Sequence, residues 1–187
     1  SSDDGLVQQA VQMSRVLRDQ LFIDGVKALN NPDSAAWIRV AEGCALTAGL
    51  IGGIGGSQCR TAIAHPIHNG LTQINEATNQ SLHGEIVGFG IIIQLQLEDL
   101  YLGNKLAKQA KKQLIEFLKQ LNLPTTIESL GLDKVSEQEI KNACKFVCEN
   151  ESYINSLPLN IDKDLLHKIL MSHTVNVSFS RLSDIKK

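Results

Sequence analysis

The stretch AHPIHNGLTQINEATNQSLHGEIVGFG, residues 64–90, holds three of the five histidines of the chain and decides how the fold is interpreted. Apolar residues recur at helical spacing over residues 62–71, which predicts a helix that carries His65 and His68. Pro66 is expected in the first turn of this helix or at a kink in it. Because the two histidines are three residues apart, they lie on the same face of the predicted helix.

A second helix is predicted where this stretch ends. The segment LHGEIVGFGIIIQLQLEDLYL, residues 82–102, is apolar on nearly every side, as a central buried helix is, and its length favours a helix over a strand. His83 stands at its start, where the imidazole can point into a helical bundle. Glu85 belongs to the first turn and is expected to interact with the helix dipole or to accept a hydrogen bond beside the site.

The rest of the chain also has helical spacing, and its composition, 43% apolar but only 4% aromatic, favours packed helices over a sandwich or barrel. The five glycines of residues 49–56 predict an interruption between helices. Residues 72–81 are expected to form a polar loop. We therefore predict one all-α domain over residues 1–187, a bundle of six to seven main helices.

The other predicted helices follow from apolar spacing and from capping residues. They are a long amphipathic helix from about Leu6 to before Pro32, a helix capped by Ser34 with Trp37, Val40, Ala41, Cys44 and Ala45 toward the core, a lysine-rich helix over residues 105–122, a short helix closed by Gly131, a helix with a Ser136–Glu139 capping box, and a last helix opened by Asp162 or Asp164.

Charge and composition exclude several functions. Eighteen basic and twenty acidic side chains give a net charge of −2, which provides no electrostatic footprint for nucleic acid or an anionic membrane. The apolar run at residues 86–93 is too short to span a bilayer, and the N-terminus is polar rather than signal-like. No glycine-rich phosphate-binding motif follows a strand. We expect a soluble, cytoplasmic protein that binds neither nucleic acid nor membrane.

The cysteines and the two remaining histidines indicate no site of their own. Four cysteines without a C-x2-C pair are expected to be buried, reduced thiols. His167 and His173 are expected at the surface or at helix ends. The three central histidines leave metal binding, acid–base chemistry and an ordinary buried role all open. Three neutral imidazoles would suit zinc or ferrous iron, although no acidic residue nearby presents itself as a further ligand.

Two pieces of sequence add a resemblance to this interpretation. GLIGGIGGSQCRTAIAHPIHNGLTQ (residues 49–73) followed by LHGEIVGFGIIIQLQLE (residues 82–98) resembles the C-terminal helical domain of the iron-containing alcohol dehydrogenase superfamily, in its glycerol dehydrogenase branch, whose plan the dehydroquinate synthases share. The resemblance covers nearly the whole chain. It implies a zinc or iron site held by one Asp and two His, with His65 and His83 as the metal ligands and His68 as a catalytic-pocket residue beside the metal.

The resemblance also implies what this chain lacks. The family's Asp ligand and its N-terminal Rossmann-like NAD(P)-binding domain lie upstream of the first long helix and are absent from this chain. In such enzymes the metal polarises the substrate oxygen while hydride moves to the nicotinamide. We therefore expect the helical half of an NAD(P)-dependent, metal-assisted alcohol or polyol (glycerol-like) dehydrogenase, acting on a small alcohol or polyol.

Further expectations follow from this interpretation. The isolated chain should be inactive, bind metal weakly or not at all, and expose an apolar face that favours homo-oligomers. Two alternatives stay open: a stand-alone helical domain derived from that family for binding or assembly, and an independent histidine metalloprotein, such as a hydrolase, whose ligands all lie within the chain.

Overall fold

The computed structural model describes residues 3–60, 62–156 and 158–174, and every regular element within these ranges is helical. The predicted all-α class is thus confirmed. The chain forms two compact units, Ser1–Thr61 and Ala62–Lys187, and each is described by itself.

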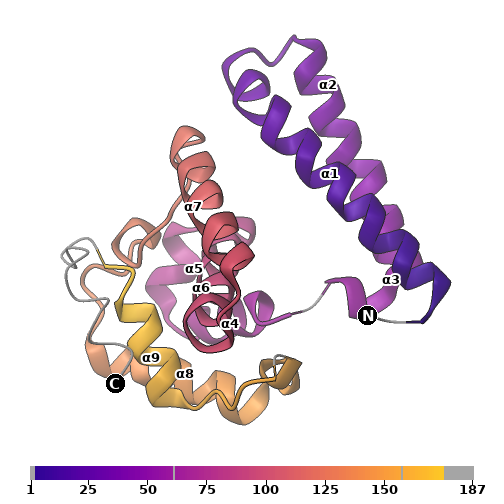
Figure 1. Cartoon of the computed structure of the whole chain (residues 1–187). Helices are drawn as coiled ribbons and strands as arrows, with labels where there is room; N and C mark the ends of the chain where they lie inside the picture. Colours follow the sequence, from indigo (N-terminus) through magenta and orange to yellow (C-terminus); the bar gives the residue numbers. More distant parts are fainter. Residues whose placement is uncertain (1–2, 61, 157, 175–187) are drawn as a thin grey trace. The chain divides into compact units, whose positions relative to one another are not determined.

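The first unit is a hairpin of helices. α1 (Gly5–Asn30) packs against α2 (Ala35–Glu42) and α3 (Ala48–Arg60) (Figure 1). A π-helical turn, η1 (Gly43–Thr47), joins α2 to α3 without a break. The predicted cap of α2 is confirmed, since the Ser34 hydroxyl accepts a hydrogen bond from the N–H of the first turn at 3.2 Å.

The predicted interruption of the helix by the glycine stretch falls at its last glycine alone. α3 runs through Gly49, Gly52, Gly53 and Gly55, and only Gly56, with φ 57° and ψ −152°, leaves the helical conformation. Each glycine in a helix costs roughly 1 kcal/mol relative to alanine, but this cost is a local preference that tertiary packing can outweigh. The packing of α3 along α1 supplies that compensation.

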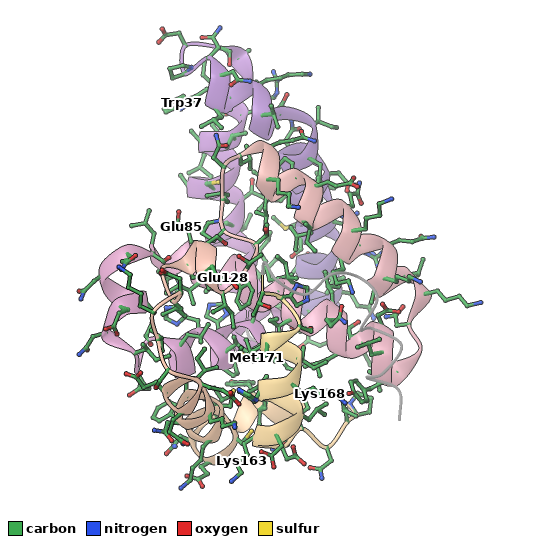
Figure 2. The ribbon with its side chains drawn as sticks, turned by 90° about the vertical axis from the view of Figure 1, so that its left-hand side faces the viewer. Trp37, Glu85, Glu128, Lys163, Lys168 and Met171 are labelled. Atoms are coloured by element: carbon green, nitrogen blue, oxygen red, sulfur yellow. The ribbon has the colours of Figure 1, made fainter. Side chains whose placement is uncertain are left out.

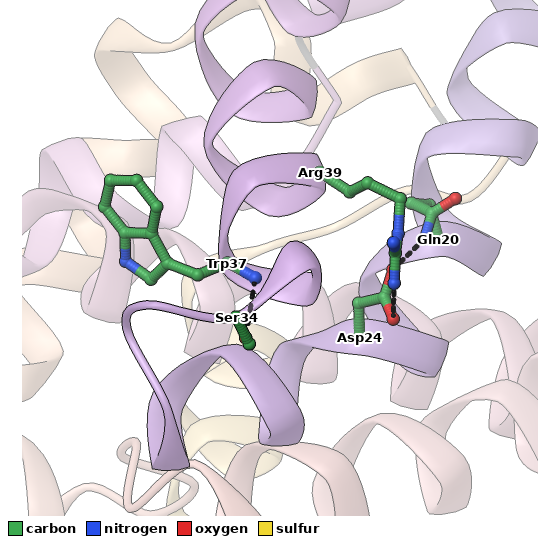
Figure 3. A network of polar contacts seen from close by, with 5 residues as sticks. All are labelled: Gln20, Asp24, Ser34, Trp37 and Arg39. Atoms are coloured by element: carbon green, nitrogen blue, oxygen red, sulfur yellow. Dashed lines mark hydrogen bonds and ion pairs between the residues drawn. The ribbon is translucent and has the colours of Figure 1, made fainter.

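The predicted core face of α2 is wrong for three of its five residues, while Val40 and Ala41 are half-buried. Trp37 is 47% exposed, and Cys44 and Ala45 are exposed too. Small residues and an ion pair make the contact with α1 instead: Ala36 is buried, and Arg39 forms two hydrogen bonds with the buried carboxylate of Asp24, at 2.7 and 2.9 Å. Figure 3 shows the indole pointing away from this pair. The Arg39 guanidinium holds the pKa of Asp24 below its usual range.

Large apolar side chains lie exposed on the first unit; among them are Val16, Ile23, Trp37, Ile38, Leu46 and Leu50. Trp37 projects from the ribbon in Figure 2. By length and composition alone, the helical run Ala35–Gly56 would also suffice to cross a membrane, and only 17% of its most apolar window is buried. A core helix of a soluble protein and a signal sequence meet the same criterion, so the expected absence of a membrane span stays a prediction.

The second unit is built around the helix that the sequence predicted to be central. α6 (His83–Leu102) packs against α4 (Ala64–Leu71), α7 (Lys105–Gln120) and α9 (Lys163–Met171), while α8 (Glu137–Asn150) contacts α4 and α9. The main core cluster takes its side chains from α4, α6, α8, α9 and the segments between them, and α7 adds buried Ala107 and Leu118. Fully buried examples are Ile67, Leu71, Ile86, Phe89, Ile93, Leu97 and Leu166.

Capping predictions in the second unit are confirmed. The Ser136–Glu139 capping box starts α8, and the Asp162 side chain accepts two N–H groups at the start of α9. Gly131, with φ 80°, closes a short 3₁₀ turn, η2 (Glu128–Leu130). A second such turn, η3 (Ser152–Ser156), follows α8, and the expected polar loop before α6 contains the short helix α5 (Asn75–Gln80).

Candidate functional site

Two glycines allow α4 to pack so closely against its neighbours that backbone atoms come into contact. This helix carries two of the three histidines. A Cβ on Gly90 of α6 would stand 2.6 Å from the carbonyl oxygen of Ala64. A Cβ on Gly70 would stand 2.9 Å from the carbonyl oxygen of Ala143 on α8 and closer still to the Val147 side chain. Glycine alone fits such approaches, so α4 is fixed between α6 and α8.

The structure brings the three predicted histidines together at one end of this contact. The ring centroids of His65 and His83 are 5.9 Å apart, and those of His68 and His83 are 4.3 Å apart. Nε2 of His68 lies 2.9 Å from Nδ1 of His83, which is hydrogen-bonding distance. His83 thus contacts both histidines of α4, as its position at the start of α6 allows.

Two further polar residues, which the sequence interpretation missed, extend this contact. Nδ1 of His68 lies 2.9 Å from Oδ1 of Asn69, and Nδ2 of Asn69 donates to Oε1 of Glu151 at 2.9 Å. Asn69 was within reach of sequence reasoning because it follows His68 directly in HPIHNG. Glu151 carried no such signal, since it lies 82 residues further along at the end of α8.

Glu85 behaves as predicted for a residue of the first turn. Its Oε2 accepts the backbone N–H of Leu82 at 2.7 Å, which satisfies one of the free donors at the start of α6. In Figure 2 it lies near the start of that helix. The carboxylate therefore stabilises the helix end on which His83 is placed.

The His65–His83 pair fits two nitrogen ligands of one metal ion. Two imidazoles bound tetrahedrally, with nitrogens about 2.1 Å from the ion, have ring centroids roughly 5 Å apart, close to the 5.9 Å observed. His68 is too close to His83 for the same arrangement, and its Nε2 is directed at a ring nitrogen. Within the described ranges, no group of three or more His, Cys, Asp or Glu residues is placed to hold a metal.

The two other histidines were predicted at the surface or at helix ends, and only His173 fits that prediction. His173 follows the end of α9, as expected of a helix-end residue, but its ring packs edge-on against Phe89 at 6.3 Å and its Nε2 is buried. Burial lowers the pKa of His173 to about 4. His167 lies within α9 with its side chain 14% exposed, and burial lowers its pKa too. Both belong to the part of the second unit where α9 packs onto the core.

The cysteines follow the prediction only in part. Cys144 is buried in the core, and burial raises the pKa of its thiol to about 12. Cys148 is half-buried, and burial raises its pKa as well. Cys44 is exposed, against the prediction, because the face of α2 and η1 that meets α1 is a different one. The side chain of Cys59 lies outside the described residues.

Known proteins resemble this chain in sequence and in fold, although no family model matches it. The chain is 42% identical over 180 residues to an uncharacterized oxidoreductase of Synechocystis sp., a match that covers 96% of this chain and 46% of that protein. It is 30% identical over 149 residues to the glycerol dehydrogenase of Thermotoga maritima, covering 80% of this chain and 39% of that one. The chain is a glycerol dehydrogenase-like helical domain.

Solved structures agree with this glycerol dehydrogenase-like assignment. The crystal structure of glycerol dehydrogenase from Schizosaccharomyces pombe matches with a TM-score of 0.74 at 26% identity, over 88% of this chain and 40% of that one. A probable glycerol dehydrogenase from Sinorhizobium meliloti 1021 matches with a TM-score of 0.75 at 25% identity, over 88% and 44%. The chain therefore spans less than half the length of these relatives.

Proposed function

We propose that this chain is the helical half of an NAD(P)-dependent, metal-assisted dehydrogenase that oxidises a small alcohol or polyol such as glycerol. The observation that carries the proposal is the convergence of His65 and His83, from two helices, at a separation that suits one metal ion. The relatives named oxidoreductase or glycerol dehydrogenase support the reaction class.

In this proposal His65 and His83 bind zinc or iron, and His68 lines the pocket beside the metal. When bound, the metal acts as a Lewis acid on the substrate oxygen and thereby favours loss of hydride from the adjacent carbon. The packing of α4 against α6 fixes the positions of the two histidines relative to each other. Metal binding therefore does not have to supply the free energy of ordering them. In this proposal the NAD(P)-binding domain and a carboxylate ligand of the metal come from outside these 187 residues. The enzyme works in the cytoplasm.

The test uses the protein expressed from its complete gene, compared with residues 1–187 alone. We expect the complete protein to contain metal and to reduce NAD(P) with glycerol or a related alcohol, and the shorter chain to show no turnover. His65→Ala and His83→Ala should each remove the metal and the activity. His167→Ala, which lies in α9 outside the histidine cluster, is the matched control and should retain both.

Two results would contradict the proposal. One is steady turnover by residues 1–187 alone, which would mean that the chain supplies a complete active site. The other is full metal content in His83→Ala, which would mean that the ion binds elsewhere.

A further inference from the structure

A continuous chain of three hydrogen bonds runs from the end of α8 to the start of α6. It links Glu151 to Asn69, Asn69 to His68, and His68 to His83, with each donor–acceptor pair 2.9 Å apart. Its members come from three helices that pack on one another, so the chain is a property of the folded second unit.

The direction of this chain is fixed by the carboxylate at its origin. An ionised carboxylate only accepts hydrogen bonds, so the Asn69 amide must turn its NH₂ toward Glu151 and its carbonyl oxygen toward His68. Nδ1 of His68 must then carry a proton to donate to that oxygen. In a neutral His68 the Nε2 is consequently an acceptor, and Nδ1 of His83 has to donate to it. The remaining nitrogen of a neutral His83, Nε2, is left with a free lone pair.

A free lone pair on Nε2 is what a histidine metal ligand needs. We propose that Glu151 and Asn69 are positioning residues that set the tautomers of His68 and, through it, of His83, so that Nε2 of His83 is available to bind a divalent metal. The metal-binding part rests on the proposed function, whereas the tautomer assignment stands on the hydrogen bonds alone. His68 in this arrangement orients the ligand as well as lining the pocket.

The position of Glu151 argues that it is placed for this purpose and not for helix stability. It is the C-cap residue of α8, at the negative end of the helix dipole, where an acidic side chain is unfavourable. Histidine ligands in metalloproteins commonly donate their second ring nitrogen to a carboxylate, a carbonyl or another acceptor, which fixes the tautomer and the ring orientation. Here that acceptor is a second imidazole, oriented in turn by an amide and a carboxylate.

The first readout is the tautomer itself. Long-range ¹H–¹⁵N NMR spectra of the 187-residue chain with ¹⁵N-labelled histidine, without metal and at mildly alkaline pH, distinguish a proton on Nδ1 from one on Nε2. We expect Nδ1–H for both His68 and His83 in the wild type. Glu151→Ala frees the Asn69 amide to turn, so both imidazoles should shift to a mixture of tautomers. Glu149→Ala is the matched control, because Glu149 is an exposed α8 residue that pairs with Lys145 at 3.8 Å.

The second readout is the affinity for cobalt(II), followed by its visible absorption. Loss of such an orienting partner typically weakens metal binding 10–100-fold, and we expect a fall of about that size for Glu151→Ala and none for Glu149→Ala. Glu151→Gln retains an acceptor oxygen and should keep most of the wild-type tautomer. Asn69→Ala, which removes the acceptor of Nδ1 of His68, is the second variant if Glu151→Ala does not fold, and it should give the same mixture of tautomers.

The outcomes separate this inference from the proposed function. Nε2–H tautomers for His68 and His83 in the wild type would overturn the inference, and so would a Glu151→Ala spectrum identical to that of Glu149→Ala. Wild-type tautomers as expected, together with no cobalt binding by the protein from the complete gene, would retain the tautomer assignment and overturn the metal site.

Discussion

Replacing Gly90 with alanine tests how the histidine site is positioned. Gly90 lies in the interior of α6, and its missing Cβ would stand 2.6 Å from the carbonyl oxygen and 3.0 Å from the Cα of Ala64. Both atoms are backbone and cannot swing aside as a side chain can. The new methyl group must therefore push α4 away from α6.

The size of the effect follows from two opposing contributions. Alanine is favoured over glycine inside a helix by about 1 kcal/mol, and overpacking a close contact costs about 1–3 kcal/mol. Gly88 is the matched control, because it lies in the same helix and a Cβ there meets nothing within 4 Å. We expect Gly88→Ala to be stabilising and Gly90→Ala to be destabilising. Because the helix preference for alanine applies to both sites, the gap between them equals the overpacking cost of about 1–3 kcal/mol. That gap corresponds to roughly 2–12 °C in melting temperature for a chain of this length.

The same displacement should reach the site, because Ala64 immediately precedes His65. Urea and thermal unfolding followed by circular dichroism measure the stability difference. Cobalt(II) titration of the protein expressed from its complete gene measures the affinity of the His65–His83 pair for metal. Gly90→Ala should therefore weaken metal binding in addition to lowering stability, while Gly88→Ala should leave binding unchanged. Equal stability of the two variants would refute the claim that backbone contact between α4 and α6 sets the site.

Two buried groups give further predictions. Burial lowers the pKa of His173 to about 4, so between pH 6.5 and 4 the unfolded chain binds a proton that the folded chain does not, and stability falls as the pH falls through this window. The loss of unfolding free energy over this window should be about 3 kcal/mol larger for the wild type than for His173→Phe. Urea unfolding at a series of pH values measures this difference, and an equal pH dependence of the two proteins would disprove it. Burial raises the pKa of the Cys144 thiol to about 12, whereas Cys44 is exposed. Iodoacetamide should therefore modify Cys44 rapidly and Cys144 only after unfolding, as measured by peptide mass mapping. Rapid modification of Cys144 in the folded chain would contradict this.

The sequence predicted those features that depend on local pattern. The length of the almost uniformly apolar segment 82–102 predicted α6, and the helical spacing at residues 62–71 predicted α4. Ser136 and Asp162 marked the starts of two later helices. Each of these signals lies within a few residues of the structure that it predicts.

Features that depend on contacts distant in sequence were missed or mispredicted. The glycine stretch is helical up to Gly55 because α3 packs along α1. Trp37 points outward because Ala36 and the Asp24–Arg39 pair occupy the contact face. No local pattern reports such a contact. Glu151 was missed for the same reason, since its partner lies 82 residues away.

The site itself depends on tertiary packing more than on helix propensity. α4 is only eight residues long and contains Pro66 and Gly70, so on its own it would be far below the length at which a helix is stable in water. It persists because Ile67 and Leu71 are buried in the core and because Gly70 and the facing Gly90 allow close contact with its neighbours. Gly70 lies within the helix, where any larger residue would collide with α8. The histidine spacing therefore has chemical meaning only in the packed unit, and substitutions at glycines that touch no metal should change metal binding.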